Sequence, residues 1–298
     1  MHAAIIGGAG RMGSWFTRYF LRRGYRVTIS DVRVDRAEEV ARILGAKLAK
    51  NNIEAAKAAD IILISTPINV IPSVIAEIMP ELERGKIIAE ISSVKGGIIP
   101  SLREAARCGV SVLSLHPLFG PGAQDMEGER IALIPVSDRL FEEELAKKIF
   151  PEAELIIVDE EAHDRAMALI LSLTHFINIV FASVVGEEDI GALKNLGGTT
   201  FTLQLLLSEG VMAEDPAIYA SIQMDNKYTI RYLERFMSRA EDLKRIISDR
   251  SLEGFVEFYR AAQNLLGRDE DFANAYERMY RALRAAQIHP SSSYNPNL

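Results

Sequence analysis

The sequence predicts an α/β protein in which a doubly wound, mostly parallel sheet is followed by an all-α domain. Short apolar segments alternate with helix-length segments over the first 159 residues, and we find no strand pattern beyond residue 160. Strands that alternate with helices form right-handed crossovers and a parallel sheet. We therefore expect a sheet domain at 1–159, a helical domain at 160–288 and a flexible tail at 289–298.

The predicted strands are apolar on both faces, as expected of strands covered by helices on each side. They are Ala3–Ile6, Arg26–Ser30, Asp60–Ser65, Lys86–Ile91, Ser111–Leu115, Arg130–Ile134 and Glu154–Val158. The predicted helices among them are Arg11–Arg23, Asp35–Leu44, Val70–Leu82, Gly97–Arg107 and Leu140–Phe150.

The second half places apolar residues at helical spacing with charged residues between them. The clearest stretches begin at Tyr232, Leu252 and Phe272. The segment Ala166–Val185 is apolar almost all round, so we expect it to be a buried central helix that lies against a second subunit. Its serine, threonine, asparagine and histidine make it too polar for a comfortable membrane span, and we predict no membrane association.

Composition and charge exclude several classes of protein. The 34 basic and 41 acidic side chains give a net charge of −7, which does not suit a non-specific nucleic-acid binder. A single cysteine, Cys108, excludes an internal disulfide framework and fits a reducing compartment, so we expect a cytoplasmic protein without a signal peptide. No Cys, His and acid cluster has metal-ligand spacing, and we predict no metal.

A glycine-rich loop separates the first predicted strand from the first helix. Gly8, Gly10 and Gly13 form G-x-G-x-x-G, which allows a tight turn, close approach of a pyrophosphate and close packing of the helix on the strand. The helix N-terminus then faces the anion. Strand, glycine loop and helix in this order predict a Rossmann-type dinucleotide site. The contact residues predicted here are Gly8, Gly10, Arg11, Met12 and Gly13.

Asp31 ends the second strand and is placed to accept hydrogen bonds from the ribose hydroxyls of the cofactor. A carboxylate there favours NAD, because it repels the 2′-phosphate of NADP. Arg33 and Arg36 follow at once and leave NADP as the alternative. The turn Ser65-Thr66-Pro67 ends another strand and either lines the nicotinamide half of the cofactor or is an ordinary turn.

His116 lies where the fifth strand stops, before a proline and several glycines. A neutral imidazole at the mouth of a cofactor cleft can take a proton from an alcohol while hydride leaves the same carbon. The alternative is a histidine whose ring is bonded to backbone carbonyls in a turn. We favour the catalytic interpretation because ligands bind at the carboxyl ends of strands.

A set of motifs in one order resembles the prephenate dehydrogenases. These are G-G-A-G-R-M-G, I-S-T-P-I, S-S-V-K-G, L-H-P-L-F-G-P, E-E-A-H-D-R-A-M-A, L-T-H-F and D-P-A-I-Y, and they run over nearly the whole chain. The chain looks most like the dehydrogenase part of the bifunctional enteric enzymes that also carry a chorismate mutase. The glycine motif alone is unspecific, whereas the combination of S-V-K, H-P-x-F-G-P and T-H-F is specific.

The resemblance implies NAD-dependent oxidative decarboxylation of prephenate to 4-hydroxyphenylpyruvate in tyrosine biosynthesis. His116 would accept the proton of the ring hydroxyl, and Ser93 matches the family serine that hydrogen-bonds the catalytic pair. Lys95 matches a substrate-contacting lysine, with a solvated loop lysine as the alternative. His175 matches a histidine that faces the substrate, although a core histidine is the plainer interpretation. We assign the pair His163-Asp164 a structural role at a helix start.

One departure from the family pattern concerns the substrate carboxylate. Many members carry an arginine six residues before the proline that matches Pro216, and this sequence has Gly210 there and no arginine at 199–219. Since arginine and lysine are not equivalent at such a site, the substrate stays open between prephenate and arogenate. The residues that could substitute are Lys95, Lys194, Gln204 and Arg11.

The remaining expectations concern partners and other functions. We expect a symmetric homodimer through the helical domain, because a second copy would bury the apolar excess of its long helix. A fused or associated chorismate mutase is left open. A hydroxyacid dehydrogenase or imine reductase with the same two-domain plan is a second candidate, but the hydroxyacid enzymes use a lysine on the buried helix, where this chain has only His175. A non-catalytic dinucleotide sensor is a third, and it needs no convergent Ser93, Lys95 and His116.

Overall fold

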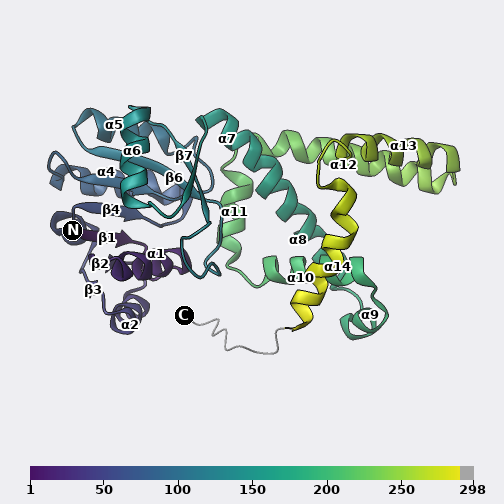
Figure 1. Cartoon of the computed structure of the whole chain (residues 1–298), viewed down its shortest axis with the longest axis horizontal. Helices are drawn as coiled ribbons and strands as arrows, with labels where there is room; N and C mark the ends of the chain where they lie inside the picture. The colour runs from purple at the N-terminus through teal and green to yellow at the C-terminus, as the bar shows by residue number, and fades with distance from the viewer. Residues whose placement is uncertain (289–298) are drawn as a thin grey trace. The chain divides into compact units, whose positions relative to one another are not determined.

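The structure is a computed structural model that describes residues 1–288 and divides into two compact units. The first unit comprises residues 1–168 and 217–227, and the second comprises residues 169–216 and 228–288 (Figure 1). The predicted tail at 289–298 lies outside the described residues. Residues 217–227 therefore join the sheet-containing unit although they follow the first part of the helical one in sequence.

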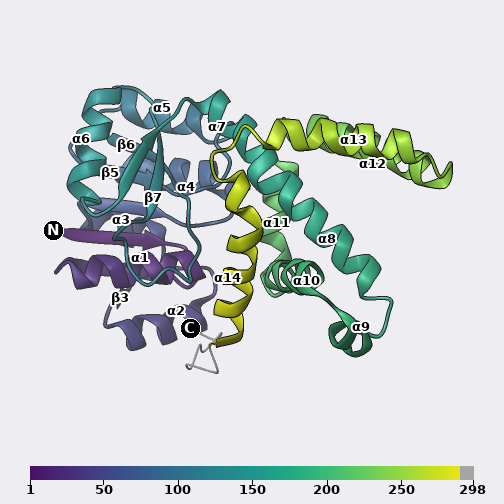
Figure 2. The same ribbon diagram turned by 45° about the vertical axis from the view of Figure 1, so that its right-hand side comes forward.

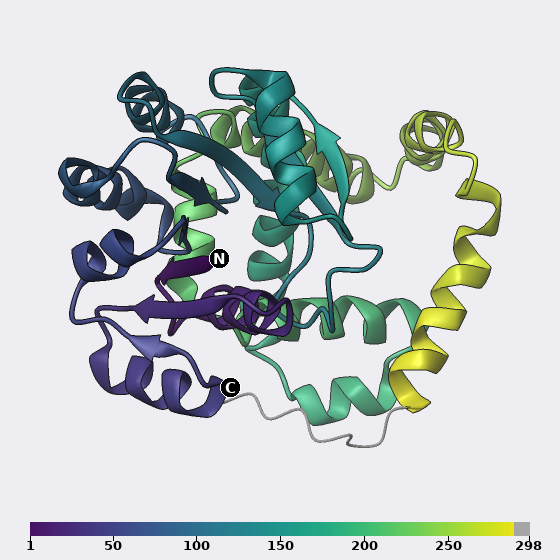
Figure 3. The same cartoon turned by 60° about the vertical axis from the view of Figure 1, so that its left-hand side comes forward.

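A sheet forms the centre of the first unit (Figure 3). It has eight strands in the order β3-β2-β1-β4-β5-β6-β7-β8. Neighbouring strands are parallel except β6 and β7, so the mostly parallel sheet that the sequence predicts is confirmed. The strands are β1 (His2–Ile6), β2 (Arg26–Ser30), β3 (Lys47–Leu48), β4 (Ile61–Ile64), β5 (Ile87–Glu90), β6 (Ser111–Pro117), β7 (Arg130–Ile134) and β8 (Glu154–Ile157).

Helices cover both faces of the sheet because successive strand residues point to opposite sides. Ala3 and Ile5 belong to the core under α1, α2 and α6, whereas Ala4 and Ile6 belong to the core under α3, α4 and α5. The helices of this unit are α1 (Arg11–Arg22), α2 (Val34–Leu44), α3 (Asn52–Ala58), α4 (Ile71–Ile78), α5 (Ile99–Arg107), α6 (Arg139–Ile149), α7 (Glu160–Met167) and α11 (Pro216–Met224), with 3₁₀ turns η1 (Ile68–Val70) and η2 (Met79–Glu81).

Two elements of this unit were not predicted. The strand β3 has two exposed residues, too few to show an alternating pattern. The helix α3 has seven residues, and its start does carry a signal: the Asn51 side chain accepts a hydrogen bond from the backbone N–H of Glu54. Asparagine followed three residues later by glutamate is a capping pattern that predicts a helix start.

The second unit is helical, and residues 158–288 contain no strand, as predicted. Helix α8 packs against α10, and α12 and α13 form a hairpin of adjacent helices (Figure 2). The elements are the π-helical segment η3 (Ala168–Leu173), α8 (Thr174–Val185), α9 (Ile190–Leu196), α10 (Thr199–Met212), α12 (Thr229–Ser248), α13 (Leu252–Leu266), the 3₁₀ turn η4 (Phe272–Asn274) and α14 (Ala275–Ile288).

Within the single chain this predicted central helix is largely uncovered, and its burial against a second subunit stays a prediction. Within α8 only Asn178 is fully buried, while Val180 is 44% and Val184 is 63% exposed. The continuous helix Glu160–Val185 is long and apolar enough to cross a membrane by length and composition, and it is the one such helix among the described residues. The single chain therefore leaves this apolar surface uncovered. The periodicity of a sequence shows that a helix is apolar but does not show which chain covers it.

Candidate active site

The glycine loop joins β1 to α1 in the first unit. Gly7 has a φ of +84°, a left-handed conformation that favours glycine, and its N–H donates to the Ser30 carbonyl at 2.8 Å. A Cβ on Gly13 would collide with the carbonyl oxygen of Gly7, so α1 can approach β1 this closely only with glycine there. The Gly10 N-cap provides no side-chain cap, which leaves the N–H groups of the first turn of α1 suited to an anion.

Asp31 lies at the end of β2 beside this loop. One carboxylate oxygen accepts the backbone N–H of Ala9 at 3.0 Å, and the side chain is only 4% exposed. Arg33 donates to the other oxygen at 3.1 Å from a half-exposed position, and Arg36 donates to the Ala9 carbonyl at 3.1 Å. The loop conformation thus depends on the acidic residue that the sequence predicts as the ribose ligand.

The turn Ser65-Thr66-Pro67 follows β4, the neighbour of β1. The backbone N–H of Ser65 donates to the Ile6 carbonyl at 2.8 Å, which brings this turn beside the glycine loop. The hydroxyl oxygen of Thr66 is buried and has no hydrogen-bond partner among the described residues. A buried hydroxyl that finds no partner in the protein is suited to a ligand group at the same place.

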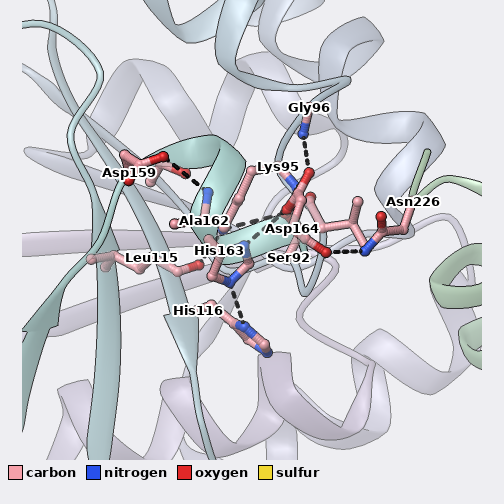
Figure 4. A network of polar contacts seen from close by, with 12 residues as sticks. Ser92, Lys95, Gly96, Leu115, His116, Asp159, Ala162, His163, Asp164 and Asn226 are labelled. Carbon is pink, nitrogen blue, oxygen red and sulfur yellow. Dashed lines mark hydrogen bonds and ion pairs between the residues drawn. The ribbon is translucent and has the colours of Figure 1, made fainter. Parts of the chain in front are cut away.

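His116 is the penultimate residue of β6, at the same carboxyl edge of the sheet, and is 6% exposed. Its Nδ1 lies 2.9 Å from Nε2 of His163, and Nδ1 of His163 lies 2.9 Å from Oδ1 of Asp164 (Figure 4). In Figure 4 the far side of the His116 ring points away from His163. Burial, followed by the positive field of Lys95 and by His163, lowers the pKa of His116 well below its ordinary value.

Backbone groups of the S-V-K-G turn hold Asp164. The N–H of Lys95 donates to its carboxylate at 3.0 and 3.2 Å, and the N–H of Gly96 donates at 2.9 Å. The side-chain amide of Asn226 donates to the backbone carbonyl of Asp164 at 2.7 Å (Figure 4). Two backbone N–H groups of this turn thus donate three hydrogen bonds to one buried carboxylate.

The structure gives Lys95 a different place from the substrate contact that the sequence predicts. Its side chain is 0% exposed, and Nζ lies 2.7 Å from Glu90 Oε1, 2.6 Å from the Leu115 carbonyl and 3.4 Å from the Ser92 hydroxyl. An ammonium group has three donors, and these three acceptors use them. Lys95 therefore ties the loop after β5 to β6, the strand that carries His116.

Ser93, predicted to bond the catalytic histidine, is half-buried next to this network. No hydrogen bond joins its hydroxyl to His116 among the residues the structure describes. The ring partner of His116 is instead His163, which sequence reasoning assigned to a structural role. The two histidines lie 47 positions apart, and only the fold brings them together.

Three further candidates lie in the second unit. His175 is half-buried in α8, and burial lowers its pKa from the ordinary value. The Gln204 amide donates to Asn178 at 3.0 Å and to Ser208 at 3.4 Å, forming a polar cluster between α8 and α10. Lys194 pairs with Glu209 at 2.7 Å on the exposed surface.

A glycine loop opens a helix, and an acidic residue follows the second strand at the same sheet edge as a buried histidine. These features define the class of Rossmann-type nucleotide-binding proteins. Two family models match: the prephenate dehydrogenase nucleotide-binding domain over residues 16–135 and the prephenate dehydrogenase dimerization domain over residues 159–261. The chain belongs to the prephenate dehydrogenase family.

Sequence relatives agree with this assignment, and a solved structure shows the same fold. The chain is 30% identical over 271 residues to a probable arogenate/prephenate dehydrogenase of Methanocaldococcus jannaschii, covering 89% of this chain and 60% of the length of that relative. It is 26% identical to the T-protein of Haemophilus influenzae, covering 94% of this chain and 70% of that one. A prephenate dehydrogenase from A. aeolicus, solved with hydroxyphenyl propionate and NAD+, has the same fold, with a TM-score of 0.73 at 18% identity over 90% of this chain and 98% of that chain.

Proposed function

We propose that this chain catalyses the NAD-dependent oxidative decarboxylation of prephenate to 4-hydroxyphenylpyruvate, a step of tyrosine biosynthesis. One observation carries the proposal: His116 is a buried imidazole with a lowered pKa, and it lies near the end of a strand at the same sheet edge as the glycine loop. A general base that must accept a proton near neutral pH has to be unprotonated there, and a lowered pKa ensures it. The names of the relatives support this substrate class.

His116 would act on the ring hydroxyl of the substrate. It takes the hydroxyl proton while the carbon that bears the oxygen loses hydride, and the opposite carboxylate leaves as carbon dioxide with its bonding electrons retained by the ring. The nicotinamide, when bound, accepts the hydride. His116 then returns its proton to the oxygen of the new phenol. We propose Ser93 as a further substrate contact, and leave Lys95 out because its ammonium is enclosed by protein acceptors.

NAD is the proposed cofactor because Asp31 is fixed where the ribose hydroxyls of the adenosine are expected. The carboxylate is held by the Ala9 N–H and would repel a 2′-phosphate. Arg33 and Arg36 are the observation that favours NADP. We expect Asp31→Ala to raise the KM for NAD and to narrow the preference over NADP. Unchanged KM values for both cofactors in steady-state assays would contradict the ribose contact.

Arogenate is the second candidate substrate. It carries an amine where prephenate carries the side-chain keto group, and the chain lacks the family arginine at 199–219. The M. jannaschii relative is itself named for both substrates. Of the substitutes considered, Lys95 and Lys194 are engaged by Glu90 and Glu209, and Gln204 by Asn178.

The deciding experiment measures formation of the reduced cofactor by absorbance, with prephenate and arogenate each tested with NAD and with NADP. Turnover of prephenate with NAD is the expected result. Turnover of arogenate alone would keep the role of His116 and reassign the substrate. Silence in all four assays would overturn the proposed reaction.

We also propose a cytoplasmic homodimer formed through the helical unit. The exposed apolar side chains of α8 and α10 lie within the stretch that matches the dimerization model. They include Val180, Val184, Leu206, Leu207 and Met212. Covering apolar surface of this kind against a second copy is the usual basis of a stable dimer. Sedimentation of the purified chain as a monomer would contradict this proposal.

A further inference from the structure

We propose that His163 and Asp164 act as a positioning pair that fixes the tautomer of His116, so that Nε2 of His116 is the nitrogen that accepts the proton. This inference rests on the proposed function for its chemistry, but its geometry does not depend on the identity of the substrate. The pair lies within the first unit, at the start of α7, and reaches His116 through one hydrogen bond.

The first step concerns the charge of Asp164. Its two carboxylate oxygens accept the backbone N–H groups of Lys95 and Gly96, at 2.9 to 3.2 Å. A carboxylate in that position is an acceptor only, because a proton on either oxygen would face an N–H donor. Nδ1 of His163, 2.9 Å from Oδ1, must therefore carry the hydrogen of this bond.

The second step follows along the chain of bonds. A neutral His163 that donates from Nδ1 has a bare lone pair on Nε2. This Nε2 lies 2.9 Å from Nδ1 of His116, so His116 must donate from Nδ1. A neutral His116 with its hydrogen on Nδ1 leaves Nε2 unprotonated, and no described residue forms a hydrogen bond with that atom. The free lone pair is what a general base requires.

The third step concerns the proton once it arrives. His116 faces Lys95 from the loop after β5 and His163 from α7, and behind them lie Glu90 and Asp164. Protonation at Nε2 makes His116 an imidazolium whose Nδ1–H points at His163. The His163 ring is in turn bonded to the carboxylate, so the new positive charge is stabilised through one intervening ring. The arrangement corresponds in role to the aspartate that holds the catalytic histidine of serine proteases.

Asp164→Asn is the diagnostic substitution because it is isosteric and reverses the chain of bonds. An asparagine oxygen at the place of Oδ2 would keep both backbone donors, the N–H of Gly96 at 2.9 Å and the N–H of Lys95 at 3.2 Å. Its NH₂ group then faces Nδ1 of His163 and requires a bare nitrogen there. His163 would carry its hydrogen on Nε2, and His116 would have to accept at Nδ1 and hold its own hydrogen on Nε2. The base would then be in the wrong tautomer.

Tautomers can be read without any substrate by ¹⁵N NMR of the full chain labelled at its five histidines. His116→Asn and His163→Asn assign the two signals. At about pH 8, above the ordinary imidazole pKa of about 6.5, we expect both rings to carry hydrogen on Nδ1. In Asp164→Asn we expect both to carry it on Nε2. A wild-type His116 with hydrogen on Nε2 would overturn the inference, even if prephenate is turned over.

Kinetics provide the second readout. We expect Asp164→Asn to lower kcat by roughly 10²- to 10⁴-fold, the usual contribution of a correctly placed base, with the Kd for NAD unchanged. His163→Asn should lower kcat in the same way, since its shorter side chain loses the bond to His116. The matched control is Asp159→Ala, which removes the N-cap of α7, where Asp159 accepts the N–H of Ala162 at 2.9 Å.

The possible outcomes distinguish the positioning pair His163 and Asp164 from the proposed reaction. A purely structural role for the pair predicts that Asp159→Ala lowers kcat as much as Asp164→Asn does, and this result would overturn the inference. A wild-type protein could show the expected tautomers and still not turn over prephenate or arogenate. This result would refute the proposed function, but the positioning pair would stand and would serve a different alcohol substrate.

Discussion

Two buried polar networks meet at Lys95, and they differ in how they end. The ammonium of Lys95 belongs to a closed network in which Glu90, Ser92 and the Leu115 carbonyl receive all three of its donors. The backbone N–H of the same residue belongs to an open chain that runs through Asp164 and His163 to His116.

The difference shows how burial can serve structure in one place and chemistry a few ångströms away. A buried ion pair whose hydrogen bonds are complete resists change, because breaking it leaves a charge without a partner. Glu90 also accepts from Ser92 and Ser114, so neither of its oxygens is idle. The chain that ends at His116 instead leaves one ring nitrogen available, and a proton can enter there without disrupting the rest.

The largest expected effect is a loss of kcat on substitution of His116, the residue at which the open chain ends. His116→Asn should lower kcat by roughly 10²- to 10⁴-fold, because it removes the proposed base. The Kd for NAD, measured by fluorescence titration, should stay near the wild-type value, since the glycine loop and Asp31 belong to other strands. A variant with wild-type kcat would show that the open end has no catalytic role.

The next effect tests the closed network. Glu90→Gln leaves the ammonium of Lys95 buried without its anion, and should lower the free energy of unfolding in urea by about 3–5 kcal/mol. Adding Lys95→Met to this variant should restore a large part of the loss, because the uncompensated charge is gone. Equal stability of the single and double variants would mean that the pair is not held together by its charges.

The pH dependence of the unfolding free energy tests the open chain through the titration of His116. Burial, Lys95 and His163 lower the pKa of His116, so the folded protein resists protonation at a pH where the unfolded chain, at about 6.5, accepts a proton. The stabilisation by the neutral ring is therefore complete above about pH 6.5 and is lost as the pH falls toward the folded pKa.

The measurement is the difference in unfolding free energy between wild type and His116→Asn from pH 8 down to pH 5, roughly the range in which histidines titrate. His2 and His175, whose pKa values are also lowered, are present in both proteins and cancel. The acid limb of kcat/KM should lie below the ordinary imidazole pKa as well. An acid limb of kcat/KM at or above the ordinary imidazole pKa would contradict a buried neutral base.

The smallest effect is expected at Asp159. Asp159→Ala removes the N-cap of α7 and should cost about 1 kcal/mol of unfolding free energy, while kcat stays near wild type. This substitution changes the stability of the helix that carries His163 without touching the bonds of either network. A large loss of turnover in Asp159→Ala would mean that activity depends on the stability of α7 and not on the hydrogen bonds of the open chain.

Much of the fold could be predicted because strand periodicity and the glycine loop are local signals. Seven of the eight strands follow the predicted apolar segments, whereas β3 has only two residues and no pattern to recognise. The apolar sequence of α8 predicts burial but does not tell which chain provides the covering surface, since the pattern is the same whether the neighbour belongs to the same chain or to another.

The site was predicted unevenly for a related reason. His116 is at a strand end, a position that periodicity locates, and the resemblance to the family added its chemistry. The hydrogen bond between His116 and His163 could not be predicted, because it depends on where the first turn of α7 meets the sheet edge. Lys95 shows the limit of a motif: the motif does not tell which way a long side chain points, and the ammonium lies against Glu90 and the Leu115 carbonyl.

The strand order has one more consequence, for redesign of the enzyme. Asp31 follows β2 and His116 lies near the end of β6, with β1, β4 and β5 between them, so four strand spacings of about 4.8 Å separate the two ends of the sheet edge by roughly 19 Å. Substitutions at such a distance usually act independently, and their free energies add. Cofactor preference could therefore be exchanged at one end of the sheet while the chemistry at the other end is left as it is.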